Sequence, residues 1–131
     1  MIYRGRTISR GRATGPALVS KDPISFLGGV DPATGEVIEK GHALYGKSVK
    51  GKVLVFPGGK GSTVGSYVMY QLMKNGAAPA AIINVRSEPI VAVGAIISGI
   101  PAVDSLEVDP MEAIKDGMSV TVDGTSGTVE A

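Results

Sequence analysis

The chain has 131 residues, of which 44% are hydrophobic and 19% are charged, a composition that indicates one globular domain with its own core. Thirteen basic and twelve acidic residues leave a formal charge of +1, which excludes a broad electrostatic attraction to nucleic acids or membrane surfaces. Cysteine is absent, and this excludes disulfides, thiol catalysis and a cysteine-ligated metal centre on this chain.

No segment approaches the ~18 consecutive apolar residues that a membrane span needs, and Arg4 and Arg6 near the N-terminus precede no apolar run. We therefore expect a soluble, cytoplasmic protein whose single domain spans residues 1–131. We also expect any iron–sulfur cluster in its chemistry to be held by another polypeptide, because this chain offers no cysteine.

The first half of the chain is predicted to be rich in β-structure. Short apolar runs bounded by turn residues predict strands over residues 2–9, 17–20, 24–30, 36–38 and 49–56. Between two of them, Pro32 and Gly35 predict a turn, because proline presets its backbone angle and glycine tolerates a positive φ. The N-terminal segment also carries four arginines, Arg4, Arg6, Arg10 and Arg12. Their spacing places several on one face of a strand, either to meet an anionic ligand or to form a solvated edge.

The second half alternates between helix and strand. The spacing of apolar residues predicts helices over residues 63–75 and 89–98, with a short one over 110–115. Strands are predicted over residues 80–85, 102–103, 119–122 and 127–130. Such alternation predicts a partly parallel sheet with crossover helices, so the fold class is α/β, with a β layer packed on an α/β layer.

The predicted helix over residues 89–98 is apolar almost all the way round. A helix of this kind is either buried inside the domain or covered by a partner. Both interpretations stay open at this point.

Residues 56–67 join an apolar strand to a helix through a glycine-rich turn that contains Ser62. A helix N-terminus carries partial positive charge and free amide donors, which would favour an anion or a developing negative charge beside this hydroxyl. The alternative is that Ser62 only caps the helix through its side-chain oxygen.

Two common phosphate-binding motifs do not fit this turn. A P-loop needs Ser or Thr after its lysine and a glycine six residues before it, but Gly61 follows Lys60 and Leu54 stands at the first glycine position. A dinucleotide-binding fingerprint has one residue too many between its glycines, and the next strand ends at Arg86 rather than at an acid.

Other candidate side chains have ordinary structural alternatives. The single histidine, His42, could join Ser62 and an acid in a hydrolase triad, but no Gly-x-Ser-x-Gly elbow occurs, so a loop role is favoured. Glu88 and Asp104 follow predicted strands, at the edge of the sheet where α/β proteins bind their ligands. Each acid is either part of a functional site or a structural residue of a turn or helix cap.

Five stretches of the sequence share a pattern with a known family. They are residues 58–67 (GGKGSTVGSY), 75–82 (NGAAPAAI), 88–95 (EPIVAVGA), 11–15 (GRATG) and 31–35 (DPATG). Together they resemble the small, swivelling subunit of the aconitase X family, and the resemblance covers most of the chain.

This resemblance implies a single swivelling β/β/α domain and a hydro-lyase subunit, active only with a large subunit that carries an iron–sulfur cluster, expected to be 4Fe-4S, on its own cysteines. Some family members dehydrate mevalonate 5-phosphate in the archaeal isoprenoid route, and others dehydrate cis-3-hydroxyproline. The run GSTVGSY is similar to the archaeal type, whereas the second group more often reads GSCSGSG. We therefore favour a small phosphorylated substrate, mevalonate 5-phosphate.

The family's catalytic serine falls on Ser62, which the resemblance implies is the proton acceptor, while the cluster acts as a Lewis acid on the departing hydroxyl. Gly61 and Thr63 are expected to contact the substrate, and Lys60 to help stabilise the alkoxide. Arg12, or another residue of the basic N-terminal group, is the candidate for the substrate phosphate. Two other functions stay open: a non-catalytic module that binds a nucleotide or another phosphorylated molecule, and a structural subunit that closes a site without supplying a group to it.

Overall fold

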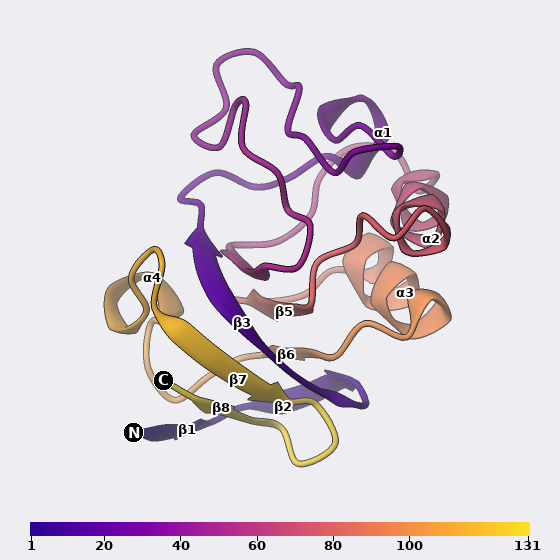
Figure 1. Cartoon of the computed structure of the whole chain (residues 1–131). Helices are drawn as coiled ribbons and strands as arrows, with labels where there is room; N and C mark the ends of the chain where they lie inside the picture. Colours follow the sequence, from indigo (N-terminus) through magenta and orange to yellow (C-terminus); the bar gives the residue numbers. More distant parts are fainter.

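The computed structural model describes all residues from 1 to 131, and both termini lie close together at one end of the molecule, away from α1 and α2 (Figure 1). The strands are β1 (Ile2–Arg4), β2 (Arg6–Ser9), β3 (Arg12–Val19), β4 (Val53–Phe56), β5 (Ala81–Asn84), β6 (Ala102–Asp104), β7 (Ser119–Asp123) and β8 (Thr128–Glu130). The helices are α1 (Phe26–Gly29), α2 (Gly65–Lys74), α3 (Pro89–Ser98) and α4 (Pro110–Ala113).

The strands form one mixed sheet in the order β1-β8-β7-β3-β4-β5-β6-β2. Strands β3 to β6 are parallel to one another, whereas the strands flanking them are antiparallel to their neighbours. Strand β3 belongs to both parts, because residues 12–16 pair with β7 and residues 17–19 pair with β4. The sheet therefore has an antiparallel part and a parallel part that share one long strand.

Gly5 is the point at which the sheet closes on itself. It alone separates β1 from β2, although these strands stand at opposite ends of the strand order. A Cβ on Gly5 would lie 2.6 Å from the Asp104 carbonyl oxygen and 2.7 Å from Leu106 Cδ2. Because no side chain fits there, glycine is required, and the predicted strand over residues 2–9 is divided into one piece that pairs with β8 and another that pairs with β6.

Two apolar cores lie on the two faces of the parallel strands. One has 10 buried residues, including Val55 and Val122, and fills the space between the parallel and antiparallel parts. The other has 18, including Met69 and Ile82, and lies between the parallel strands and α2 and α3. Figure 1 shows the resulting layers of antiparallel strands, parallel strands and helices. This β/β/α arrangement confirms the predicted fold class.

Several other predicted elements differ from the structure, among them the strand predicted over residues 49–56, which begins only at Val53. Residues 24–30 form an isolated bridge at Ile24 and the single turn α1 rather than a strand, because Gly28 takes a φ of +81°. Strand β3 begins at Arg12 rather than at residue 17, because its early residues, which include Gly15 and Pro16, pair with β7, a partner distant in sequence. Residues 36–38 form only isolated bridges.

No helix of this structure combines the length and the apolar character that a membrane crossing requires.

Candidate functional site

The glycine-rich loop over residues 57–64, which we call the Ser62 loop, leaves the carboxyl end of β4 and leads into α2. The parallel strands β4, β5 and β6 all end at this edge, which is the edge where α/β sheets bind ligands. The fold therefore places Gly61, Ser62 and Thr63, three of the predicted site residues, together in one exposed loop.

Backbone hydrogen bonds hold the base of this loop on both sides. On one side, the Ile24 amide donates to the Gly58 carbonyl (3.2 Å), and the Lys60 amide donates back to the Ile24 carbonyl (3.1 Å). On the other side, the Arg86 amide donates to the Pro57 carbonyl (3.2 Å). The loop base is thus an extended segment fixed between two neighbours, and its tip projects into solvent.

Gly61 takes a conformation that suits glycine. Its φ is +86°, and a Cβ on it would lie 2.6 Å from Ser25 Oγ. That hydroxyl is itself engaged, since it donates to the Leu27 carbonyl at 3.0 Å. The close packing of the Gly61 backbone against Ser25 fixes the direction in which the chain enters Ser62.

The Ser62 side chain is exposed, and its Oγ accepts a hydrogen bond from the Val64 amide at 3.1 Å. The Ser62 carbonyl accepts from the Gly65 amide at 2.9 Å, which forms a turn ahead of α2. The helix itself begins at Gly65 rather than at residue 63, and no side chain caps it. Ser62 is therefore a turn residue whose hydroxyl hydrogen is free for a ligand.

The free amide donors lie earlier than the sequence predicted. The amides at the start of α2 donate to the carbonyls of residues 62–64, so they are not available. In contrast, the amides of Gly61, Ser62 and Thr63 make no hydrogen bond within the chain. Three consecutive unpaired donors thus lie in the same loop as the Ser62 hydroxyl, and such donors can bind an anion or stabilise a developing negative charge.

An apolar groove of about 440 Å³ begins beside Ser62 and runs between α2 and α3. We call it the α2–α3 groove; its lining residues are Thr63, Val64, Ser66, Tyr67, Pro89, Ile90, Val93 and Ile97. None of these is charged. The two helices are joined beneath the groove by the Ser66 hydroxyl, which donates to the Ile90 carbonyl at 2.8 Å.

Helix α3 combines the two alternatives that the sequence left open. Its inner face packs closely on α2, since a Cβ on Gly94 would overlap the Met69 side chain. Its outer face is apolar and exposed, with Val93 48% and Ile96 59% accessible. The helix therefore contributes to the core and also presents an apolar surface to its surroundings.

Lys60 belongs to the loop but does not point freely toward Ser62. Its Nζ lies 3.2 Å from Glu39 Oε2, and both side chains remain partly exposed. The sequence offered no signal for this pairing, because Glu39 lies in a loop without regular structure.

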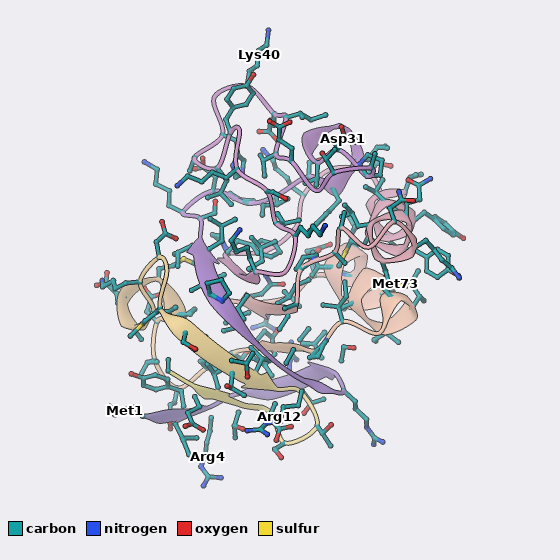
Figure 2. All side chains as sticks on the ribbon, in the orientation of Figure 1. Met1, Arg4, Arg12, Asp31, Lys40 and Met73 are labelled. Carbon is teal, nitrogen blue, oxygen red and sulfur yellow. The ribbon has the colours of Figure 1, made fainter.

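Arg12 does not belong to this site. It begins β3, whereas Ser62 lies beyond the carboxyl end of the parallel strand β4, so the sheet separates them by roughly 20 Å or more at ~3.3 Å per residue. Arg12 instead lines a polar pocket with Asp123 and Glu130. Figure 2 shows it near Met1 and Arg4, at the end of the molecule that holds both termini. Within this chain Arg12 and Ser62 therefore do not lie side by side.

His42 is buried, and both of its ring nitrogens have partners within the chain. Nδ1 accepts from the Leu44 amide (3.0 Å), so Nε2 carries the hydrogen and donates to the Pro23 carbonyl (2.9 Å). The histidine therefore fixes its own loop to residues 22–23. A serine triad with Ser62 is excluded by this geometry.

Glu88 and Asp104 both have structural roles. The Glu88 carboxylate caps α3 by accepting from the amides of Ile90 (2.8 Å) and Val91 (2.9 Å). Asp104 is fully buried and forms a bidentate ion pair with Arg6 at 2.9 and 2.7 Å.

The ion pair shifts both pKa values. Burial acts to raise the pKa of Asp104, but the hydrogen bond and charge of Arg6 and the Ser87 amide together lower it below its ordinary value. The same hydrogen bond and charge raise the pKa of Arg6. Asp104 therefore remains ionised at neutral pH despite its burial.

Metal-ligating side chains do not gather anywhere in the structure: no group of three or more His, Cys, Asp or Glu is placed to hold an ion.

The family model described as the aconitase X swivel domain matches residues 2–131, which is nearly the whole chain. The chain belongs to the aconitase X family. A solved structure of Thermococcus kodakaraensis aconitase X in its holo-form matches with a TM-score of 0.94 and 55% sequence identity, covering 99% of this chain and 97% of the other. The swivel fold and the resemblance drawn from the sequence are confirmed.

Relatives from archaea carry a more specific name. Phosphomevalonate dehydratase small subunits of Methanocella arvoryzae and Methanosarcina mazei are 77% and 70% identical to this aconitase X chain. The matches cover 99% and 98% of it, and 98% and 89% of the relatives. A solution NMR structure of a UPF0107 protein is also similar, with a TM-score of 0.89 and 53% identity over 99% of this chain and 98% of that one.

Proposed function

We propose that this chain is the small subunit of a phosphomevalonate dehydratase, which converts (R)-mevalonate 5-phosphate to trans-anhydromevalonate 5-phosphate in the archaeal mevalonate pathway of isoprenoid biosynthesis. The observation that carries the proposal is the exposed Ser62 hydroxyl, in a loop at the carboxyl edge of the parallel strands whose amides at residues 61–63 are unpaired. The name shared by the archaeal relatives supports this substrate over cis-3-hydroxyproline.

In this reaction Ser62 is the proton acceptor. Dehydration removes a proton and a hydroxyl group from adjacent carbons: the proton goes to Ser62, the electrons of the broken C–H bond form the double bond, and the C–O bond breaks with its electrons on the departing hydroxide. The hydroxide becomes water by taking up a proton, and Ser62 returns to its starting form when it gives up the proton that it accepted. An alcohol is a very poor base in water, so the alkoxide form of Ser62 needs electrostatic stabilisation. The Val64 amide already donates to this oxygen at 3.1 Å, and the N-terminus of α2 adds partial positive charge.

Gly61 and Thr63 bind the substrate through backbone amides. Both amides are unpaired in the chain. Unpaired N–H donors favour an anionic or carbonyl group of the substrate over an apolar one. Lys60 can add its positive charge once it leaves Glu39. Thr63 also lines the α2–α3 groove, so it connects the polar loop to the apolar surface.

The family resemblance implies an iron–sulfur cluster, but the residues of this chain do not fit one. It has no cysteine, and no group of three potential ligands is placed to hold a metal. The cluster, expected to be 4Fe-4S, would be held by the large subunit. The catalytic contribution proposed for this chain is confined to Ser62 and its loop.

The large subunit packs against the α2–α3 groove. This surface is apolar, carries no charge, and is continuous with the Ser62 loop through Thr63. Tyr67 and Val93, one from each helix, are 67% and 48% exposed. Because the relatives are named small subunits, a partner exists to cover such a face, and covering it would bring the partner's part of the site to Ser62.

The decisive experiment is anaerobic turnover of mevalonate 5-phosphate by this chain reconstituted with its large subunit. Ser62→Ala should lower kcat by roughly a hundredfold or more, the scale of losing a positioned acid–base group. Ser126→Ala, which changes an exposed serine in a distant turn, is the matched control and should be unaffected. If Ser62→Ala matches wild type, Ser62 is only a turn residue and the chain closes the site without supplying a group.

Two further arms separate the alternatives. Activity on cis-3-hydroxyproline but not on mevalonate 5-phosphate would leave the family role intact and contradict the proposed substrate. Titration of the isolated chain with nucleotides should show no binding, whereas saturable binding without the large subunit would favour a phosphate-binding module.

A further inference from the structure

A partly buried chain of hydrogen bonds connects the N-terminal strand β2 to the base of the Ser62 loop. The Arg6 guanidinium holds the Asp104 carboxylate, whose Oδ2 also accepts from the Ser87 amide at 2.7 Å. The Ser87 hydroxyl donates to Asn84 Oδ1 at 2.9 Å. Asn84 Nδ2 then donates to the Phe56 carbonyl at 3.2 Å, at the junction of β4 with the loop.

The segment over residues 84–88 contacts every residue of the loop base. The Phe56 carbonyl accepts from Asn84 and also from the Val85 amide (3.3 Å), and the Pro57 carbonyl accepts from the Arg86 amide. The Arg86 carbonyl and the Glu88 carboxylate lie so close to Gly58 and Gly59 that neither glycine has room for a Cβ. The position of residues 84–88 therefore determines where residues 56–59 lie.

The links that hold residues 84–88 in place include the end of β5, the cap of α3 and the buried Asp104, and in addition the Ser105 amide donates to the Val85 carbonyl at 3.0 Å. The first two would suffice to build the sheet and the helix. The third fixes the turn between them, because the Ser87 amide is bound to a carboxylate that is itself held by two hydrogen bonds from Arg6. Charge-assisted bonds of this kind are strong and directional, and here the carboxylate is buried while the Arg6 side chain is 55% exposed.

We propose that Arg6, Asp104, Ser87 and Asn84 are positioning residues that hold the Ser62 loop in its reactive placement. The proposal rests on the role of Ser62 stated above. A displacement of a catalytic group by about 1 Å can lower a rate roughly a hundredfold, so a tether several residues away from Ser62 can control turnover without touching the substrate.

The first test measures the loop itself and needs neither the large subunit nor a substrate. Amide hydrogen exchange of the full chain is followed by NMR for wild type, Arg6→Ala and Arg10→Ala. Arg10 is the matched control because it is an exposed arginine of the same segment whose side chain makes no bond. We expect Arg6→Ala to raise the exchange rates of the Lys60 and Val64 amides by roughly fivefold or more, and Arg10→Ala to leave them unchanged. Faster exchange confined to β2 and β6 would overturn the proposal.

The second test measures turnover of the reconstituted enzyme. Arg6→Ala should lower kcat roughly tenfold with little change in KM, and Arg6→Lys should restore part of the loss. In a Ser62→Ala background, Arg6→Ala should cause no further loss, because a residue that acts through Ser62 has nothing left to position. A full further loss in that background would show general structural support instead.

Ser87→Ala covers the case in which Arg6→Ala folds poorly, since it removes only the hydroxyl link to Asn84 and keeps the backbone bond to Asp104. It should produce the same pattern in both tests with a smaller amplitude, and unchanged exchange and kcat would overturn the proposal. If wild type fails to dehydrate mevalonate 5-phosphate, the proposed function fails while the exchange measurement still decides the positioning role.

Discussion

Lys60 Nζ lies 3.2 Å from Glu39 Oε2, which ties the only cationic side chain of the glycine-rich loop to the neighbouring segment over residues 36–46. Both side chains are partly exposed, so this pair contributes less than about 1 kcal/mol to folding. The lysine can therefore exchange Glu39 for an anion at the loop at little cost. Whether Lys60 binds the substrate is therefore decided by the effect of its substitution on KM.

We expect Lys60→Gln to raise KM for the substrate roughly tenfold, because a charge-assisted contact to an anion is lost, while the free energy of unfolding changes by less than about 1 kcal/mol. Glu39→Gln should lower KM, since it releases the lysine. Steady-state kinetics of the reconstituted enzyme measure both effects. Lys115→Gln, an exposed lysine beyond α4, is the control, and an equal shift in that variant would rule out a specific role for Lys60.

Gly61→Ala should impair both stability and turnover. The residue has a φ of +86°, and a Cβ would lie 2.6 Å from Ser25 Oγ, so the loop must move away from Ser25. Gly46→Ala is the matched control, because Gly46 has a φ of +82° with nothing within 4 Å of a Cβ. Both variants should lose about 1–2 kcal/mol in urea unfolding, as a left-handed alanine does, but only Gly61→Ala should lose kcat. Equal kcat values would show that the loop tolerates displacement.

The Ser62 loop could be predicted from sequence because its signals are local. An apolar strand, a run of glycines and an amphipathic helix follow one another within residues 53–74, and each has a short-range pattern. The start of α2 was predicted two residues too early, because the bonds from residues 65–67 to residues 62–64 form turns that precede the helix. That difference moved the free amides from the helix to residues 61–63.

The rest of the site depends on contacts between distant parts of the chain. Arg6 and Asp104 are 98 residues apart, and they meet only because the sheet closes at Gly5 and places β2 beside β6. Arg12 was assigned to the site because nothing in the sequence shows that β3 begins at the opposite end of the sheet. A spacing rule finds residues that share one element, but it does not give the order of strands.

Asp104 should make the stability of the protein pH-dependent. Its pKa is lowered in the folded state, so the contribution of the ion pair is complete above the unfolded value of about 3.9 and is lost as the pH falls through the lower, folded pKa. In urea unfolding, the difference between wild type and Asp104→Asn should be constant from pH 7 to about pH 5 and shrink below about pH 4. Glu112→Gln, at an exposed position, is the control and should show no such trend. For Asp104→Asn, a difference in stability that grows toward low pH would contradict the lowered pKa of Asp104.

His42→Ala should destabilise the fold without changing the chemistry. Both ring nitrogens are used by backbone groups, and their removal leaves the Leu44 amide and the Pro23 carbonyl without partners. We expect a loss of about 2 kcal/mol in urea unfolding and an unchanged kcat at a temperature where the variant is folded. A large loss of kcat with unchanged stability would return His42 to the list of catalytic candidates.

Val93→Asp should weaken the association with the large subunit. Val93 is 48% exposed and lines the α2–α3 groove, so a carboxylate there would be buried without a partner when the groove is covered. Ile2→Asp is the control, because Ile2 is 61% exposed on β1, in the antiparallel part of the sheet away from α2 and α3. Calorimetric titration with the large subunit should show Kd raised tenfold or more for Val93→Asp and unchanged for Ile2→Asp. If thermal unfolding shows Val93→Asp to be folded and its Kd equals that of wild type, the partner covers a face other than the α2–α3 groove.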